Sequence, residues 1–284
     1  MLDFRADLHC HTIYSDGSFT TREILLLAKQ KGLQGLAITD HDSIGAYRDA
    51  ITEAQEIGIE LLTGVEFSAA HHNISIHILG YGFHPFDPTI QRLCDFHKQR
   101  REERNAAIIK KLCEHNMALT IEEVNAAASH PATTIGRPHI ALAMMRKGYV
   151  ASIQDAFWEF IGEGRPCFSR GHDVSVADTL DVIHQAKGVA IIAHPHLIKN
   201  QGILQELLEM NFEGLEGYYA KQSPQQNARW LKIAEKRNWL ITGGSDFHGE
   251  MRSGDLGSSY VLEETFRKLQ GVYLMNLPIR TSDE

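Results

Sequence analysis

The sequence predicts an α/β protein in which seven strands of a βα series form a barrel that carries a helical insertion. Short apolar runs rich in β-branched residues alternate with amphipathic helical patterns, which is typical of a parallel sheet covered by helices. The chain has 284 residues, and a barrel of about eight strands takes about 250. The segment 87–170 breaks the alternation, because it is helical and charged. We therefore assign residues 1–86 and 171–284 to the barrel and residues 87–170 to an inserted helical subdomain.

The expected strands follow the apolar runs in chain order. They lie near 4–10, 34–40, 59–67, 74–82, 188–193, 213–218 and 239–245. Stretches with apolar residues at helical spacing separate most of these strands, and they lie near 21–31, 43–57, 176–187, 201–210 and 223–237. The sequence contains no low-complexity tract or Pro/Ser-rich linker, so we expect the insertion to pack against the barrel.

The composition is that of an ordinary globular protein, with 43% hydrophobic and 23% charged residues. A net charge of −8 disfavours binding to duplex DNA, although a local positive site could still bind a short anionic substrate. No apolar run approaches the roughly 18 residues of a membrane span, and no secretory signal is present, so we expect a cytoplasmic protein with no membrane partner. The cysteines form no CxxC pair, which argues against a disulfide framework; they are Cys10, Cys94, Cys113 and Cys167.

The first predicted strand ends in two histidines that suggest metal chemistry. The chain contains 16 histidines, many of them at the ends of apolar runs. His9 and His11 point to one face of a strand while Cys10 points to the other. Two imidazoles on one face suit a divalent metal ion. Alone the pair is a weak signal, because polar residues are common at strand ends.

Metal-binding residue types recur on later strands. The carboxyl ends of parallel strands gather on one rim of a barrel, so residues far apart in the sequence converge there. Imidazole nitrogen and carboxylate oxygen bind Zn²⁺, Mn²⁺ and Fe²⁺, and a carboxylate can bridge two ions about 3.5–4 Å apart. Six strands together predict a metal centre, to which the later strands contribute His41, Glu66, His77, His194, Asp246 and His248.

These motifs resemble those of the PHP (polymerase and histidinol phosphatase) family of metal-dependent phosphoesterases. The match covers residues 3 to about 260 through Asp7-Leu8-His9-Cys10-His11, Thr39-Asp40-His41, Gly64-Val65-Glu66, His77, Ala193-His194-Pro195 and Gly244-Ser245-Asp246-Phe247-His248. The resemblance implies a distorted, TIM-like (β/α)7 barrel that holds three divalent ions, with manganese expected and iron or zinc as alternatives. It also implies nine metal ligands, namely His9, His11, Asp16, His41, Glu66, His77, His194, Asp246 and His248.

Within the family, the chain resembles the bacterial 3′,5′-nucleoside bisphosphate phosphatases that also act as 5′–3′ exoribonucleases. The resemblance lies in the length, in Gly136-Arg137-Pro138-His139 of the insertion, and in Ala193-His194-Pro195-His196. It implies removal of the 3′-phosphate from nucleoside 3′,5′-bisphosphates (pAp to AMP) and 5′–3′ trimming of short single-stranded RNA. At a helix start, Arg137 with His139 would bind a substrate phosphate. His196 would contact the scissile phosphate or protonate the leaving oxygen.

The predicted charges favour a phosphate substrate. Three divalent ions and three carboxylates leave a cationic site in a protein of net charge −8. Divalent ions lower the pKa of a bound water from 15.7 toward about 7, so hydroxide would be available to attack phosphorus. Arg137 or His196 would stabilise charge that the metals do not reach.

Three other functions stay open at this point. A histidinol-phosphate phosphatase would use the same metals with a different pocket. A non-catalytic or proofreading PHP module would act joined to a polymerase, which nothing in this sequence resembles. An amidohydrolase shares the HxH strand end but usually holds one or two ions.

The sequence leaves the native metal and the oligomeric state open. We interpret the remaining polar clusters as solvated surface: the run Lys98 to Arg104 and the histidines His71, His72, His84, His97, His115, His130, His172 and His184.

Overall fold

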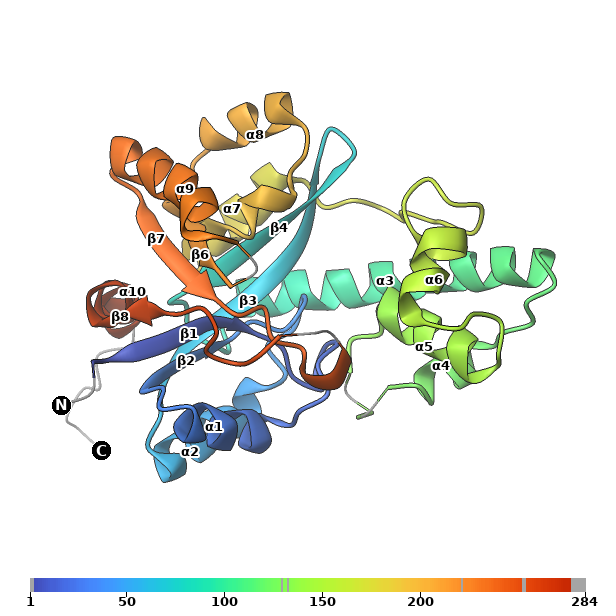
Figure 1. Ribbon diagram of the computed structural model, residues 1–284, viewed down its shortest axis with the longest axis horizontal. Helices are drawn as coiled ribbons and strands as arrows, with labels where there is room; N and C mark the ends of the chain where they lie inside the picture. The colour runs from blue at the N-terminus through green and yellow to red at the C-terminus, as the bar shows by residue number, and fades with distance from the viewer. Residues whose placement is uncertain (1–2, 129, 132, 221, 252–253, 277–284) are drawn as a thin grey trace.

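The computed structural model describes residues 3–276 except residues 129, 132, 221 and 252–253, and it has the predicted α/β barrel (Figure 1). Eight strands of the described chain form one sheet in the order β7-β6-β5-β4-β3-β2-β1-β8. Their bounds are β1 Arg5–Cys10, β2 Gly35–Ile38, β3 Glu60–His71, β4 Ile74–Tyr81, β5 Val189–Ile192, β6 Gly214–Tyr219, β7 Leu240–Gly244 and β8 Val261–Leu262.

The barrel closes where the end of β1 meets the segment after β7. Cys10 and Phe247 form a parallel bridge, the His11 N–H donates to the Phe247 carbonyl at 2.8 Å, and the Asp246 N–H donates to the His9 carbonyl at 2.9 Å. Gly244 permits this approach, because a Cβ there would lie 2.4 Å from the Cβ of His9. Closure therefore brings the first and last predicted ligand motifs together.

Strand β4 departs from the predicted parallel series. It pairs antiparallel with both β3 and β5. Two residues in left-handed conformation, His72 and Asn73, connect β3 to β4, and a connection this short can make only a hairpin. The short strand β8, which the sequence did not indicate, pairs antiparallel with β1.

Helices cover the outside of the barrel, and their apolar faces pack on the sheet (Figure 1). Thr20 and Ser223 cap two of them with side-chain hydrogen bonds to the third helical residue. The bounds are α1 Thr21–Gln30, α2 Tyr47–Ile57, α7 Val176–Gln185, α8 Gln201–Leu208, α9 Pro224–Arg237 and α10 Glu263–Asn276. Among the described residues, no helix is both long and apolar enough to span a bilayer.

The insertion is helical, as expected, and lies to one side of the barrel (Figure 1). It contains α3 Pro88–Glu114, α4 Ile121–Asn125, α5 Arg137–Arg146, α6 Ile153–Ala156 and a π-helical turn at Phe157–Ile161. Ile90 of α3 belongs to the barrel's apolar cluster, whereas Ile108 belongs to a separate cluster of the insertion. The separate cluster supports a distinct subdomain, and α3 joins the two bodies. The division at residues 87 and 170 stays a prediction.

The middle of α3 contradicts the interpretation of Lys98 to Arg104 as a solvated face. Arg100, Arg101 and Arg104 are buried, and so is His97, which we expected on the surface. These four positions have the spacing i, i+3, i+4 and i+7, so they lie on the helix face that packs inward.

Candidate functional site

The nine predicted metal ligands converge at the rim where β1, β2, β5 and β7 end. Four groups of donors among the described residues have their ligand atoms within 4.8 Å of one another, and three of them lie at this rim. These three groups share members, and they are His11, Asp16, His41 and His248; His9, His11, Glu66 and Asp246; and His41, Glu66 and His77. His194 joins them through its Nε2, which lies 2.8 Å from Glu66 Oε1. The long-range convergence that the sequence predicted is therefore present.

The Glu66 carboxylate lies among five imidazoles. Its Oε2 is 3.2 Å from one nitrogen of each of three rings, those of His9, His11 and His41. Its Oε1 is 2.7 Å from His77 Nδ1 and 2.8 Å from His194 Nε2. A carboxylate in this position has the geometry to bridge neighbouring ions.

Asp16 and Asp246 contact other histidines of the cluster. Asp16 Oδ1 lies 3.3 Å from His248 Nε2, and Asp246 Oδ1 lies 3.4 Å from His11 Nε2. His248 donates its Nδ1 proton to the Asp246 carbonyl at 2.8 Å, which directs its other ring nitrogen toward Asp16.

A buried carboxylate fixes the turn that carries Asp16. Asp40 accepts hydrogen bonds from the Thr12 N–H at 2.7 Å, from the Thr12 hydroxyl at 2.6 Å and from the Ser15 hydroxyl at 2.6 Å. Gly17 completes the turn, since a Cβ there would lie 2.3 Å from the His11 carbonyl oxygen. The polar residues after His11 therefore hold Asp16 beside the strand end.

The imidazoles change the electrostatics of the carboxylates. Burial alone raises the pKa of Glu66, but the rings of His41, His77 and His9 outweigh burial and hold that pKa well below its usual range. Burial likewise opposes ionisation of Asp246, and His9 is the largest of the influences that hold its pKa low. Both groups are therefore anionic at neutral pH.

This donor set fits divalent metal ions. Several inward-facing atoms are buried without a hydrogen bond in the part of the chain that the structure describes, namely His9 Nε2, His11 Nε2, His41 Nδ1 and Glu66 Oε2. Buried polar atoms rarely lack partners. Imidazole nitrogen with carboxylate oxygen suits Zn²⁺, Mn²⁺ or Fe²⁺, and an ion would satisfy all four atoms.

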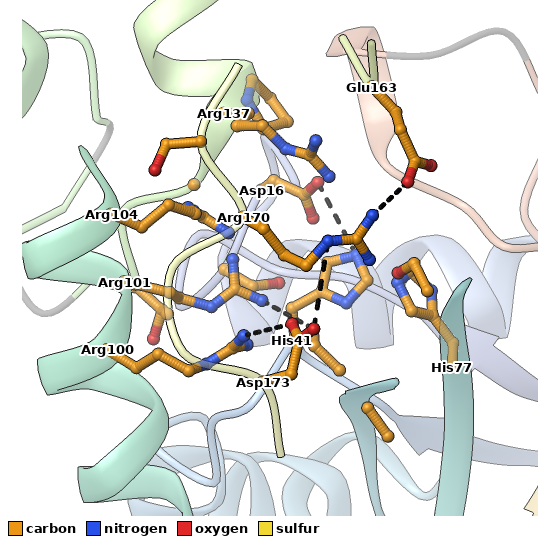
Figure 2. Close-up of a pocket in the computed structure, with 18 of the residues that line it drawn as sticks. Asp16, His41, His77, Arg100, Arg101, Arg104, Arg137, Glu163, Arg170 and Asp173 are labelled. Carbon is orange, nitrogen blue, oxygen red and sulfur yellow. Dashed lines mark hydrogen bonds and ion pairs between the residues drawn. The ribbon is translucent and has the colours of Figure 1, made fainter. Parts of the chain in front are cut away.

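A cavity of about 170 Å³ adjoins the ligand cluster, and Figure 2 shows the side chains around it. Asp16, His41 and His77 line the cavity on the side of the cluster. Among the described residues, five arginines surround the rest, and they are Arg100, Arg101, Arg104, Arg137 and Arg170. We call this cavity the arginine pocket.

Three of these arginines are neutralised by carboxylates. Arg101 donates two hydrogen bonds to Asp42, one of them through Nε at 2.8 Å. Arg100 lies 3.9 Å from Asp173 and donates to the His172 carbonyl at 2.9 Å. Arg170 pairs with Glu163 and also lies 3.9 Å from Asp173.

Arg104 and Arg137 form no ion pair in the described part of the chain. Arg104 is 7% exposed, and among the described residues its guanidinium bonds only to the Asn105 side-chain oxygen, at 3.1 Å through the closer nitrogen. Arg137 lies over the rings of Phe157 and Phe168, with its guanidinium carbon 5.9 and 5.5 Å from their centroids. Burial first, and then neighbouring arginines, lower the pKa of both groups. Because buried charges are normally paired, this side of the pocket is built to receive an anion.

The predicted substrate contacts have different surroundings. Arg137 lines the pocket, as a phosphate-binding residue should. His139 is buried at the start of α5, where its Nδ1 accepts the Gly136 N–H at 3.0 Å. The His196 ring lies at a tilt beside Tyr219, with ring centroids 4.3 Å apart, and its centroid is 6.4 Å from that of His194. Neither histidine is among the residues that line the pocket, so their substrate contacts stay predictions.

Sequence reasoning missed the arginines of α3. The signal was available, because Leu93, His97, Arg100, Arg104 and Ile108 continue one helical stripe. Apolar residues at both ends of the stripe place the polar residues between them on the buried face. A buried face that carries several cations indicates an anion site.

Comparison with known proteins supports the same chemistry. The PHP domain family matches residues 7–250. A 5′–3′ exoribonuclease of Haemophilus influenzae is 33% identical over 250 residues, which cover 85% of this chain and 89% of that protein. A phosphoribosyl 1,2-cyclic phosphate 1,2-diphosphodiesterase of Eggerthella lenta is 27% identical, covering 86% and 94%. A 3′,5′-nucleoside bisphosphate phosphatase of Chromobacterium violaceum is 28% identical, covering 88% and 90%.

A solved structure has a similar fold. The crystal structure of a protein from Bifidobacterium adolescentis, assigned as a metal-dependent phosphoesterase, superposes with a TM-score of 0.86 at 30% identity and covers 94% of this chain and 96% of its own. Its assignment and the names of the sequence relatives support a phosphoester hydrolase. The chain belongs to the PHP domain family.

Proposed function

We propose that this protein removes the 3′-phosphate from nucleoside 3′,5′-bisphosphates and trims short single-stranded RNA from its 5′ end. The observation that carries the proposal is that the ligand cluster and the arginine pocket adjoin, because Asp16, His41 and His77 belong to the cluster and also line the pocket. A substrate with two phosphates would place the reacting phosphate at the cluster and the other at Arg104 and Arg137.

The proposed metal centre holds three divalent ions, one near each donor group, with Mn²⁺ expected and Fe²⁺ or Zn²⁺ as alternatives. The nine ligands are those that the family resemblance implies, and His194 would share an ion with Glu66. When bound, such ions act as Lewis acids on the phosphoryl oxygens and lower the pKa of water. Ligand positions shared between groups would keep the ions close together.

The residues of the pocket bind and orient the substrate. A guanidinium can hold a phosphate through two parallel hydrogen bonds, so Arg137 would fix the orientation of the phosphate that is not cleaved. Its position over the rings of Phe157 and Phe168 attracts the guanidinium without neutralising its charge. Arg104, on the same side of the pocket, would add a second charge.

The names of two relatives agree with this substrate class. The Haemophilus influenzae relative is a 5′–3′ exoribonuclease and the Chromobacterium violaceum relative is a 3′,5′-nucleoside bisphosphate phosphatase. The Eggerthella lenta relative supports a second candidate, hydrolysis of a cyclic phosphate diester on a phosphoribosyl group. That substrate also carries more than one phosphate group, so the arginine pocket alone does not separate the two candidates.

A panel of substrates tests the proposal. Purified protein with added Mn²⁺ is assayed for hydrolysis of adenosine 3′,5′-bisphosphate, 3′-AMP, AMP, histidinol phosphate, phosphoribosyl 1,2-cyclic phosphate and a 5′-phosphorylated oligoribonucleotide. We expect the bisphosphate and the 5′-phosphorylated RNA to give the highest kcat/KM. A tenfold preference for histidinol phosphate or for the cyclic phosphate would refute the proposed substrate while leaving the family assignment intact.

A further inference from the structure

Glu216 is a buried carboxylate beside the ligand cluster that belongs to none of its donor groups. It lies on β6, a strand that supplies no predicted ligand, and it is 1% exposed. Each of its oxygens accepts one hydrogen bond. Oε1 lies 3.0 Å from His9 Nδ1, and Oε2 accepts the main-chain N–H of His194 at 2.8 Å. Glu216 therefore contacts two predicted metal ligands from opposite ends of one carboxylate.

The bond to His9 determines which ring nitrogen can bind a metal. With the Glu216 oxygen as the acceptor, His9 Nδ1 is the donor. The neutral ring then has its lone pair on Nε2. That nitrogen lies 3.2 Å from Glu66 Oε2 and 3.5 Å from Asp246 Oδ1, inside the ligand cluster. Glu216 thus selects the tautomer in which the unprotonated nitrogen of His9, Nε2, points into the ligand cluster.

The bond to His194 fixes a strained main chain. His194 follows β5 with φ 27° and ψ 60°, a left-handed conformation that non-glycine residues rarely adopt. The bend turns the side chain of His194 toward Glu66 and leads into Pro195. A charge-assisted hydrogen bond to the N–H at the bend stabilises it, and such bonds are stronger than neutral ones.

We propose that Glu216 is a positioning residue, which sets the tautomer of His9 and holds the bend at His194 so that both rings meet the metal centre. This inference rests on the proposed metal centre. The carboxylate is required in both roles because it accepts from two donors at once. A glutamine at this place has one acceptor oxygen and one amide donor, so it can satisfy His9 Nδ1–H or the His194 N–H but not both.

The test compares Glu216→Gln with Glu213→Gln. Glu213 precedes the same strand, accepts the Ala190 N–H at 2.8 Å and pairs with His184, away from the ligand groups. Titration of the metal-free proteins with Zn²⁺ or Mn²⁺, followed by metal analysis, gives affinity and stoichiometry. We expect Glu216→Gln to weaken metal binding about 10- to 100-fold, which is the usual effect of removing a residue that hydrogen-bonds to a metal ligand. The Glu213 variant should bind like wild type, and equal affinity in both variants would overturn the inference.

A second measurement uses the wild-type protein and so does not depend on how the variant folds. Two-dimensional ¹H–¹⁵N spectra of the Zn²⁺-loaded protein report which nitrogen of each histidine carries a proton, and a His9→Gln sample assigns the His9 signals. The inference requires His9 with Nδ1 protonated and Nε2 bound. A proton on Nε2 would overturn it. The substrate panel decides the proposed reaction separately, because these two readouts involve no turnover.

Discussion

Replacing Arg104 with methionine should raise the stability of the protein and lower its activity. Arg104 is buried with no carboxylate partner in the described chain, and its environment lowers its pKa. An uncompensated buried charge costs several kcal/mol of desolvation. Methionine keeps most of the apolar stem, but it leaves the Asn105 side-chain oxygen without the bond from Arg104, a loss of about 1–3 kcal/mol. We expect a net gain of about 1–2 kcal/mol in the free energy of unfolding.

The same change should remove a charge-assisted bond to the phosphate that is not cleaved. One such bond contributes about 1.5–3 kcal/mol, which corresponds to a fall in kcat/KM of about tenfold to 160-fold. The fall should occur for adenosine 3′,5′-bisphosphate. It should be absent for 3′-AMP, which lacks the 5′-phosphate.

Urea denaturation and steady-state phosphate release measure the two effects. Thermal unfolding should shift upward by about 2–4 °C per kcal/mol. Arg92→Met is the matched control, because Arg92 is exposed on the same helix, and it should leave stability and activity unchanged. A drop in stability would refute the argument that Arg104 is an uncompensated buried charge, and an equal loss of kcat/KM for both substrates would refute its assignment to a second phosphate.

The other predictions concern the pocket, the ligand cluster and pH. Arg137→Lys should lower kcat/KM for 5′-phosphorylated substrates at least about tenfold with unchanged metal content, whereas Arg146→Lys, in the exposed last turn of the same helix, should not; equal rates would make Arg137 a packing residue. Glu66→Gln should remove at least one ion in metal analysis and abolish phosphate release, and wild-type metal content would contradict its role as a ligand. Burial lowers the pKa of His97 to about 4, against about 6.5 when unfolded, so protonation of the unfolded chain should reduce stability as pH falls through this window. Between pH 7 and 4.5, the free energy of unfolding of wild type should fall by about 2 kcal/mol more than that of His97→Gln, as measured by urea denaturation. Parallel plots of this free energy against pH for the two proteins would refute the prediction.

Much of the metal site was predictable because its residues sit at ends of elements that local pattern reveals. Each apolar run ends within a few residues of a histidine or carboxylate, and the convergence of strand ends follows from barrel geometry alone. Glu66 and His77 are exceptions, because they lie within β3 and β4 rather than at the strand ends. His77 still reaches the site because β4 runs antiparallel as the second arm of a hairpin, which places its middle beside Glu66 on β3.

Other parts of the site could not be predicted because they depend on tertiary contacts. Nothing local distinguishes Glu216 from an ordinary polar residue of a strand, since its role arises from His9, 207 positions earlier in the chain. Periodicity can place Arg104 on the inward face of α3, but the side chains that surround it in the pocket come from other elements and appear only in the fold. Propensity and periodicity therefore locate elements, while the surroundings of a single polar side chain need the fold.

The barrel rim and the insertion are joined through Asp42, and this contact explains how the pocket and the ligand cluster keep a fixed separation. Asp42 follows the predicted ligand His41 in a left-handed conformation, with φ 52°. Its carboxylate accepts the Ser68 N–H at 2.7 Å on the barrel side and two bonds from Arg101 on α3. Burial opposes its ionisation, but His97 and Arg101 outweigh burial and hold the pKa of Asp42 low. A charge so placed cannot move without exposing a buried partner, so the insertion is held at one distance from the rim, as the proposed selection of substrates by the spacing of two phosphates requires.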